Sequence, residues 1–250
     1  MTTTTATLTP HRLESPHRVV SVTRLLFANP FQILVLPMII LVGVLLTNIA
    51  IWVLIKSVAN GTVPAFQTGA LAYVIVYSII VGVQAISRTF PFSLGFGVTR
   101  RDFYFGSLIA FVILAAMYTV VMTILNLFEI ATNGWWLDGH MFTPIFFDAG
   151  TVPLQSLLYF VSLLVSLFVG AGVATFYVRW KSTGVVCFFG GLTVLIVAAW
   201  AIVTYTHNWP AVFAWLMNTG ALEMVAWMLV PAAAIAVAGF FNLRRATPKG

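Results

Sequence analysis

Six long runs of apolar residues decide what this chain can fold into. Each run has about 20 residues or more, which is the length that an α-helix needs to cross the roughly 30 Å hydrocarbon core of a bilayer. Charged side chains make up only 7% of the 250 residues, against roughly 25% in ordinary soluble domains. Because so few charges cannot cover a water-soluble globule, the sequence predicts an integral membrane protein.

The runs are continuous and show no alternation of polar and apolar residues, so they predict helices and not the strands of a barrel. The expected fold class is therefore an all-α integral membrane protein with six transmembrane helices. The predicted spans are Phe31–Ile55, Thr68–Ser87, Phe103–Phe128, Leu154–Tyr177, Val185–Tyr205 and Met224–Leu243. Residues 30–243 form the transmembrane domain, and residues 244–250 form a cytoplasmic tail.

The Lys and Arg residues fall almost entirely on one side of these spans. Before the first span, between the second and third, between the fourth and fifth, and after the sixth lie Arg12, Arg18, Arg24, Arg88, Arg100, Arg101, Arg179, Lys181, Arg244, Arg245 and Lys249. Lys56 is the single cation on the other side. Because positive residues concentrate in cytoplasmic segments, we expect a multi-pass protein of the cell membrane with both termini in the cytoplasm.

Short elements flank the spans. Residues 1–16 are expected to be disordered, and residues 17–29 to form an amphipathic connecting helix on the cytoplasmic face. The apolar positions of this helix are Val19, Val22, Leu25 and Leu26. It is interpreted either as an anchor on anionic lipid or as a docking element. On the outer side, Trp209–Met217 is apolar but too short to cross, so it predicts a re-entrant helix before the last span.

The sequence lacks the common motifs of enzymes. No glycine-rich loop ends in Gly-Lys-Ser or Gly-Lys-Thr, and no His is followed by Glu-x-x-His. The single cysteine, Cys187, excludes an internal disulfide and a cysteine-based metal set. The cations do not share a polar face with aromatic residues, as nucleic-acid binding would require. We therefore expect no enzymatic activity, no bound cofactor or metal, and no nucleic-acid partner.

The acidic residues avoid the middle of the predicted spans, which disfavours a carrier driven by protons or sodium. Glu129 and Glu223 are expected at the outer ends of the third and sixth spans. They are interpreted either as exposed interfacial carboxylates or as the lining of an outer vestibule, with Phe213 and Trp215 at a gate. The long outer segment, residues 129–153, is expected to fold onto the membrane surface with its aromatic residues as an interfacial belt.

Polar and small residues inside the spans predict helix packing. Gln32, Asn48, Gln84 and Asn126 are interpreted as interhelical hydrogen-bonding groups. The small residues Gly170, Gly172, Ala174, Gly190 and Gly191 are expected to let helices approach closely.

The segment between the second and third spans has the most informative pattern. It reads Arg88-Thr-Phe-Pro-Phe-Ser-Leu-Gly-Phe-Gly-Val-Thr-Arg-Arg-Asp-Phe-Tyr-Phe-Gly106. The residues predicted to break the helix are Pro91, Gly95 and Gly97. The apolar residues Phe90, Phe92, Leu94 and Phe96 form a short apolar element flanked by cations, and exposed apolar side chains in a loop favour a partner. Thr99 and Asp102 form the capping pattern of the third span, while Arg100 and Arg101 are interpreted either as anchors or as partner contacts.

This loop resembles that of the ABC-2-type permeases, the membrane subunits of ATP-binding-cassette exporters, in which Phe-Pro-x-x-x-Gly-x-Gly-x-Thr/Ser-Arg-Arg-Asp joins the second and third spans. The layout of connecting helix, six spans and re-entrant element is also similar. The resemblance implies that Phe90–Val98 forms a coupling helix in a groove of a separate ATPase subunit. It also implies that two permease chains pair around a central pathway; we expect a homodimer, and a heterodimer is the alternative.

The expected function is therefore that of an exporter's permease subunit, surrounded by membrane lipids, with ATP and Mg²⁺ bound by the partner ATPase. The sequence does not decide whether the substrate is a hydrophobic drug, a peptide, a lipid or a glycan. Two alternatives remain, a non-transporting membrane scaffold or sensor subunit and a secondary carrier. Copurification of an ATP-hydrolysing subunit distinguishes the exporter from both.

Overall fold

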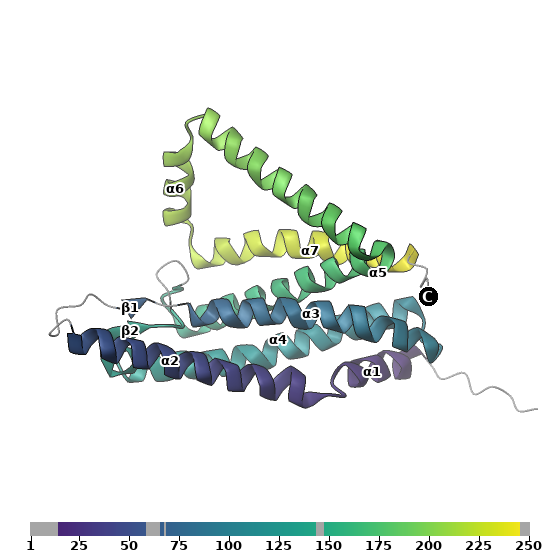
Figure 1. Cartoon of the computed structure of the whole chain (residues 1–250), viewed down its shortest axis with the longest axis horizontal. Coiled ribbons are helices and arrows are strands. Elements are labelled where there is room, and N and C mark those ends of the chain that lie inside the picture. Colours follow the sequence, from purple (N-terminus) through teal and green to yellow (C-terminus); the bar gives the residue numbers. More distant parts are fainter. Residues whose placement is uncertain (1–14, 59–65, 68, 144–147, 246–250) are drawn as a thin grey trace, which may run out of the picture.

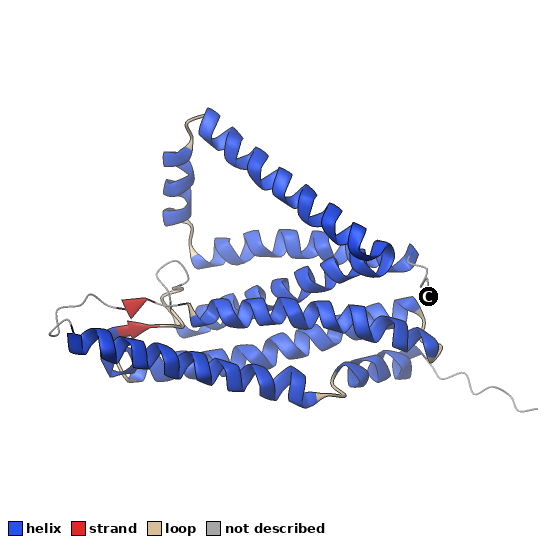
Figure 2. Ribbon diagram, in the orientation of Figure 1, coloured by secondary structure: helices blue, strands red, loops and turns tan. Residues whose placement is uncertain are grey.

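The computed structural model describes residues 15–58, 66–67, 69–143 and 148–245. In this part the regular elements are helices, apart from one small pair of strands, and loops connect them (Figure 2). The helices are α1 (Ser15–Leu26), η1 (Phe31–Val35), α2 (Leu36–Val58), α3 (Ala70–Gly95), α4 (Arg100–Ala131), η2 (Gly134–Asp138), α5 (Val152–Tyr205), α6 (Trp209–Asn218) and α7 (Ala221–Arg245). The strands β1 (Phe66–Gln67) and β2 (Gly139–His140) pair in parallel. Most of the predicted disordered terminus, residues 1–14, lies outside the described residues.

Five helical segments are long and apolar enough to cross a membrane. They are Phe31–Val58, Ala72–Gly95, Arg100–Ala131, Val152–Val178 and Trp180–Tyr205. These segments agree with the prediction of an all-α, multi-pass membrane protein. The described apolar stretch of α7, Ala226–Val237, is shorter, so the sixth span stays a prediction.

The first half of α5 is the centre of the bundle, because α3, α4 and α7 all pack against α5 (Figure 1). A Cβ added at Gly170 would lie 2.0 Å from a backbone oxygen of α3, and one at Gly82 would lie 2.3 Å from a backbone oxygen of α5. Gly172 similarly faces α7. Close approach at Gly170 and Gly172 is therefore confirmed. The same prediction is wrong for Gly190 and Gly191, where an added Cβ would meet nothing within 4 Å in the described structure.

α5 is two helices joined at Lys181, whose φ of 54° and ψ of −140° are not helical. The second helix runs away from the bundle, and α6 leads back to α7, so the three outline a triangle (Figure 1). In the most apolar window of Trp180–Tyr205, 0% of the residues are buried. A helix this apolar and this exposed fits lipid or another chain around it.

The basic residues of the described helices gather at one end of the molecule. The last turn of α1, the turn between α3 and α4, the break in α5 and the end of α7 all lie there (Figure 1). Arg24 lies in the last turn of α1, Arg100 and Arg101 in the first turn of α4, and Lys181 at the break in α5. Arg88 lies about two turns before the end of α3. Lys56, in the last turn of α2, lies at the opposite end beside the strands. The fold thus keeps the charge separation that the sequence predicts.

Candidate functional site

The predicted coupling loop is the tip of a helical hairpin formed by α3 and α4. α3 continues through Pro91 to Gly95, so the prediction that Pro91 breaks the helix is wrong. Ser93 Oγ donates to the carbonyl of Phe90 at 2.9 Å inside the protein, and this contact stabilises the turn around the proline. The chain then reverses at Gly97, whose φ of 74° is a conformation that glycine adopts readily.

The four apolar side chains of the tip do not share one environment. Phe90 is 0% exposed and packs edge-on against Phe103, with ring centroids 5.1 Å apart, so its expected exposure is wrong. Leu94 is half-buried against the core. Phe92 and Phe96 are 54% and 72% exposed, and their rings contact each other at 4.8 Å. Helical spacing explains the difference, because Phe92 in the last turn of α3 and Phe96 directly after that helix lie about one turn apart, on the side away from Phe90 and Leu94.

The second helix of the hairpin, α4, begins with a side-chain cap. Thr99 Oγ1 accepts a hydrogen bond from the backbone N–H of Asp102 at 3.2 Å, which confirms the predicted cap of α4. The guanidinium of Arg101 lies over the ring of Phe105 at 5.7 Å. The cap and the packing of Phe90 fix both sides of the turn, so the exposed Phe92–Phe96 pair is presented by a well-defined backbone.

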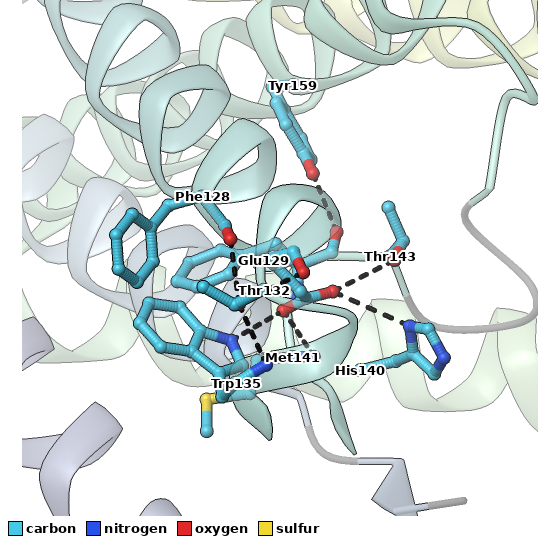
Figure 3. Close-up of polar contacts among 9 residues, drawn as sticks. Phe128, Glu129, Thr132, Trp135, His140, Met141, Thr143 and Tyr159 are labelled. Carbon is cyan, nitrogen blue, oxygen red and sulfur yellow. Dashed lines mark hydrogen bonds and ion pairs between the residues drawn. The ribbon is translucent and has the colours of Figure 1, made fainter. Parts of the chain in front are cut away.

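A second candidate site is polar and surrounds Glu129, near the other end of α4 (Figure 3). Its side chain is buried, and its two oxygens accept four hydrogen bonds. The donors are Trp135 Nε1 at 3.1 Å, Met141 N at 2.9 Å, Phe142 N at 3.2 Å and Thr143 Oγ1 at 3.0 Å. His140 Nδ1 lies 3.7 Å from the same carboxylate. The interpretation of Glu129 as an exposed interfacial carboxylate is therefore wrong.

The backbone around these donors is left-handed over several residues. Asn133, Trp135, Trp136 and Asp138 have φ values of 48°, 60°, 60° and 56°, a region that residues other than glycine rarely enter. Thr132 Oγ1 accepts a hydrogen bond from Trp135 N at 3.0 Å, and this bond, like those to Glu129, helps to hold the conformation. Trp135 is buried, whereas Trp136 is 75% exposed. Residues 132–143 thus form a packed segment, called the cap below. Only some of its aromatic side chains are exposed.

This cap joins three long helices, α2, α4 and α5. Lys56 at the end of α2 pairs with Asp138 at 3.6 Å, and Trp52 of α2 stacks on Phe66 of β1 at 5.5 Å. From α5, Tyr159 donates a hydrogen bond to the carbonyl of Phe142 at 2.7 Å (Figure 3). In the described part of the chain no three His, Cys, Asp or Glu residues lie together as a metal site. The geometry indicates that Glu129 positions the cap.

The other predicted outer-gate residues do not join this cluster. Phe213 and Trp215 of α6 are about half exposed, and Glu223 is exposed in the first turn of α7. Trp215 packs against Trp227, with ring centroids 5.8 Å apart. The described contacts of Glu129 come instead from the segment that follows α4. In the described structure Glu129 therefore lies apart from Phe213, Trp215 and Glu223, and the four do not form one gate.

Comparison with protein-family models, with curated proteins and with solved structures finds no match to this chain. Its function is therefore inferred from its own residues. In the cap, the oxygens of the buried Glu129 accept their hydrogen bonds from within the cap itself. The hairpin tip, by contrast, presents an exposed aromatic pair, and it is the better candidate for contact with another protein.

Proposed function

We propose that this chain is the transmembrane permease subunit of an ABC-type exporter. The observation that carries the proposal is the exposed Phe92–Phe96 pair at the tip of the α3–α4 hairpin. The sequence pattern from Phe90 to Asp102 supports it through its resemblance to the coupling loop of ABC-2-type permeases. In this function the tip rests in a groove of a separate ATPase subunit, which binds ATP and Mg²⁺.

The length of the hairpin supports this role. α4 has 32 residues, or about 48 Å at roughly 1.5 Å per residue, whereas the hydrocarbon core is about 30 Å thick. The first turns of α4 also pack against α1, where Thr23 Oγ1 donates to the carbonyl of Gly106 at 3.1 Å. In this proposal the surplus length of α4 lies at the tip, which extends past the hydrocarbon. Burial of Phe92 and Phe96 in a protein groove gives each roughly 1.5–3 kcal/mol.

The proposal includes the topology and the assembly. α7 is the sixth span, α1 is the cytoplasmic connecting helix, α6 is the re-entrant outer element, and both termini lie in the cytoplasm of a cell-membrane protein. Two copies of the chain form a homodimer around the pathway. Closure of the ATPase subunits on nucleotide pushes the two hairpin tips together, and the spans switch the pathway from the inner to the outer side.

The test compares Phe92→Asp and Phe96→Asp with wild type, after purification of the tagged chain from its native membrane. A carboxylate in the groove loses its hydration without gaining a partner, so both variants should lose most of the copurifying ATPase and its hydrolysis. Ser182→Asp is the matched control, because it adds the same charge at the exposed break in α5. Full ATPase recovery in both aspartate variants would reject the coupling role and favour a scaffold or a carrier.

A further inference from the structure

A cavity of about 170 Å³ lies between the α1–α2 connection and the helices α3 and α4. Its apolar wall includes Leu26, Ile33, Val81, Phe111 and Leu114, and its polar lining includes Gln32, Gln84 and Arg88. A cavity of roughly 150 Å³ is large enough to hold benzene. This one can therefore accept an apolar group of that size, such as part of an acyl chain.

The polar side of the cavity presents hydrogen-bond donors and a positive charge. Gln32 Nε2 donates to Gln84 Oε1 at 2.9 Å, so each of these two residues hydrogen-bonds between helices, as predicted. The NH₂ group of Gln84 has no acceptor among the described residues. Arg88 follows one turn later on α3, is exposed, and forms no ion pair within the described structure. Together these groups match the chemistry of a phosphate.

The cavity lies where the membrane is expected to begin. Its α1–α2 side contains Asn29, two residues before the start of the first predicted span, and Arg88 directly follows the end of the second. Val81 lies seven residues further into α3, or about 10 Å at roughly 1.5 Å per residue. A ligand with its charge at Arg88 would therefore place its apolar part at the depth of the hydrocarbon.

We propose that this cavity binds one anionic phospholipid of the cytoplasmic leaflet. The phosphate lies against Arg88 and the Gln84 amide, and the upper part of one acyl chain packs along Val81 and Leu114. Charge complementarity decides the class of lipid, because this end of the molecule carries most of the described cations and attracts anionic headgroups. A zwitterionic headgroup brings its own cation close to Arg88, so it binds more weakly. The site depends on membrane placement, not on the proposed exporter function.

The test is native mass spectrometry of the purified full chain, titrated with phosphatidylglycerol or with phosphatidylcholine of the same acyl chains. Wild type should bind one phosphatidylglycerol about tenfold more tightly than phosphatidylcholine. Arg88→Ala should remove most of this preference. Lys181→Ala is the matched control, because it removes an exposed cation from the same end but outside the cavity, and it should bind like wild type.

A second variant tests the apolar wall. Ala85→Leu narrows the cavity without changing charge, so it should weaken phosphatidylglycerol binding in a sample that elutes as wild type on gel filtration. Equal affinities of the wild-type chain for the two lipids would overturn the proposal, and this comparison needs no variant. An Arg88→Ala chain that keeps the wild-type preference would also overturn it.

Discussion

A single buried carboxylate can organise a whole loop when the loop turns its donors inward. Glu129 accepts hydrogen bonds from the backbone of Met141 and Phe142 and from the side chains of Trp135 and Thr143. Each bond to a charged acceptor is worth about 1.5–3 kcal/mol. The left-handed residues between Asn133 and Asp138 cost free energy. The hydrogen bonds to the Glu129 carboxylate offset the cost of this left-handed backbone.

Glu129→Gln should loosen this cap. The neutral amide oxygen is a weaker acceptor than a carboxylate oxygen for the N–H groups of Met141 and Phe142, and the amide NH₂ replaces the oxygen that accepts from Thr143 Oγ1. We expect amide hydrogen exchange at Met141 and Phe142 to accelerate by about tenfold or more, because roughly 1.4 kcal/mol corresponds to a factor of ten. Glu223→Gln is the matched control, since Glu223 is exposed. Equal protection of the two amides in wild type and Glu129→Gln would contradict the assigned role.

The sequence predicts single residues well where the interaction is local. The Thr99–Asp102 cap joins residues three positions apart and was predictable from spacing alone. The surroundings of Glu129 were not, because two of its donors are backbone N–H groups, which no residue type marks. The Trp135 and Thr143 side chains were visible in the sequence, but their approach to Glu129 depends on left-handed turns that no glycine signals at Trp135 or Trp136.

At the scale of helices, the contact between α3 and α5 depends on small residues. Gly170→Ala should destabilise the bundle, because the new methyl group would lie 2.0 Å from a backbone oxygen of α3. Such overpacking costs roughly 1–3 kcal/mol, so the Tm in detergent should fall by several degrees. Gly43→Ala is the control, since a Cβ there meets nothing within 4 Å in the described structure. Identical melting of the two variants would refute the close crossing.

Helix ends were harder to predict than helix existence. The second span was expected to end at Ser87, because the segment after it contains a proline, two glycines and cations. In the structure α3 continues to Gly95, since the packing of Phe90 on Phe103 outweighs the hydrogen bond lost at Pro91. The break between the fourth and fifth spans was expected near Arg179 and Lys181, and α5 bends at Lys181.

For the whole molecule, composition was enough to predict a multi-pass helical protein, because apolar length is a direct requirement of the bilayer. The arrangement of the helices was not predictable in the same way. The exposed second half of α5 and the triangle that it forms with α6 and α7 depend on long-range packing (Figure 1). The sequence places the cations on one side of the spans, and the fold brings those in the described helices to one end.

Both proposals require that the α3–α4 hairpin tip faces the cytoplasm, and labelling of single cysteines tests this most directly. In a Cys187→Ala background, Trp136→Cys reports the cap and Ser182→Cys reports the basic end, since both positions are exposed. An impermeant thiol reagent applied to intact cells should label Trp136→Cys, and should label Ser182→Cys only after permeabilisation. Labelling of Ser182→Cys in intact cells with protection of Trp136→Cys would contradict the topology, and with it both the coupling role of the hairpin and the cytoplasmic lipid site.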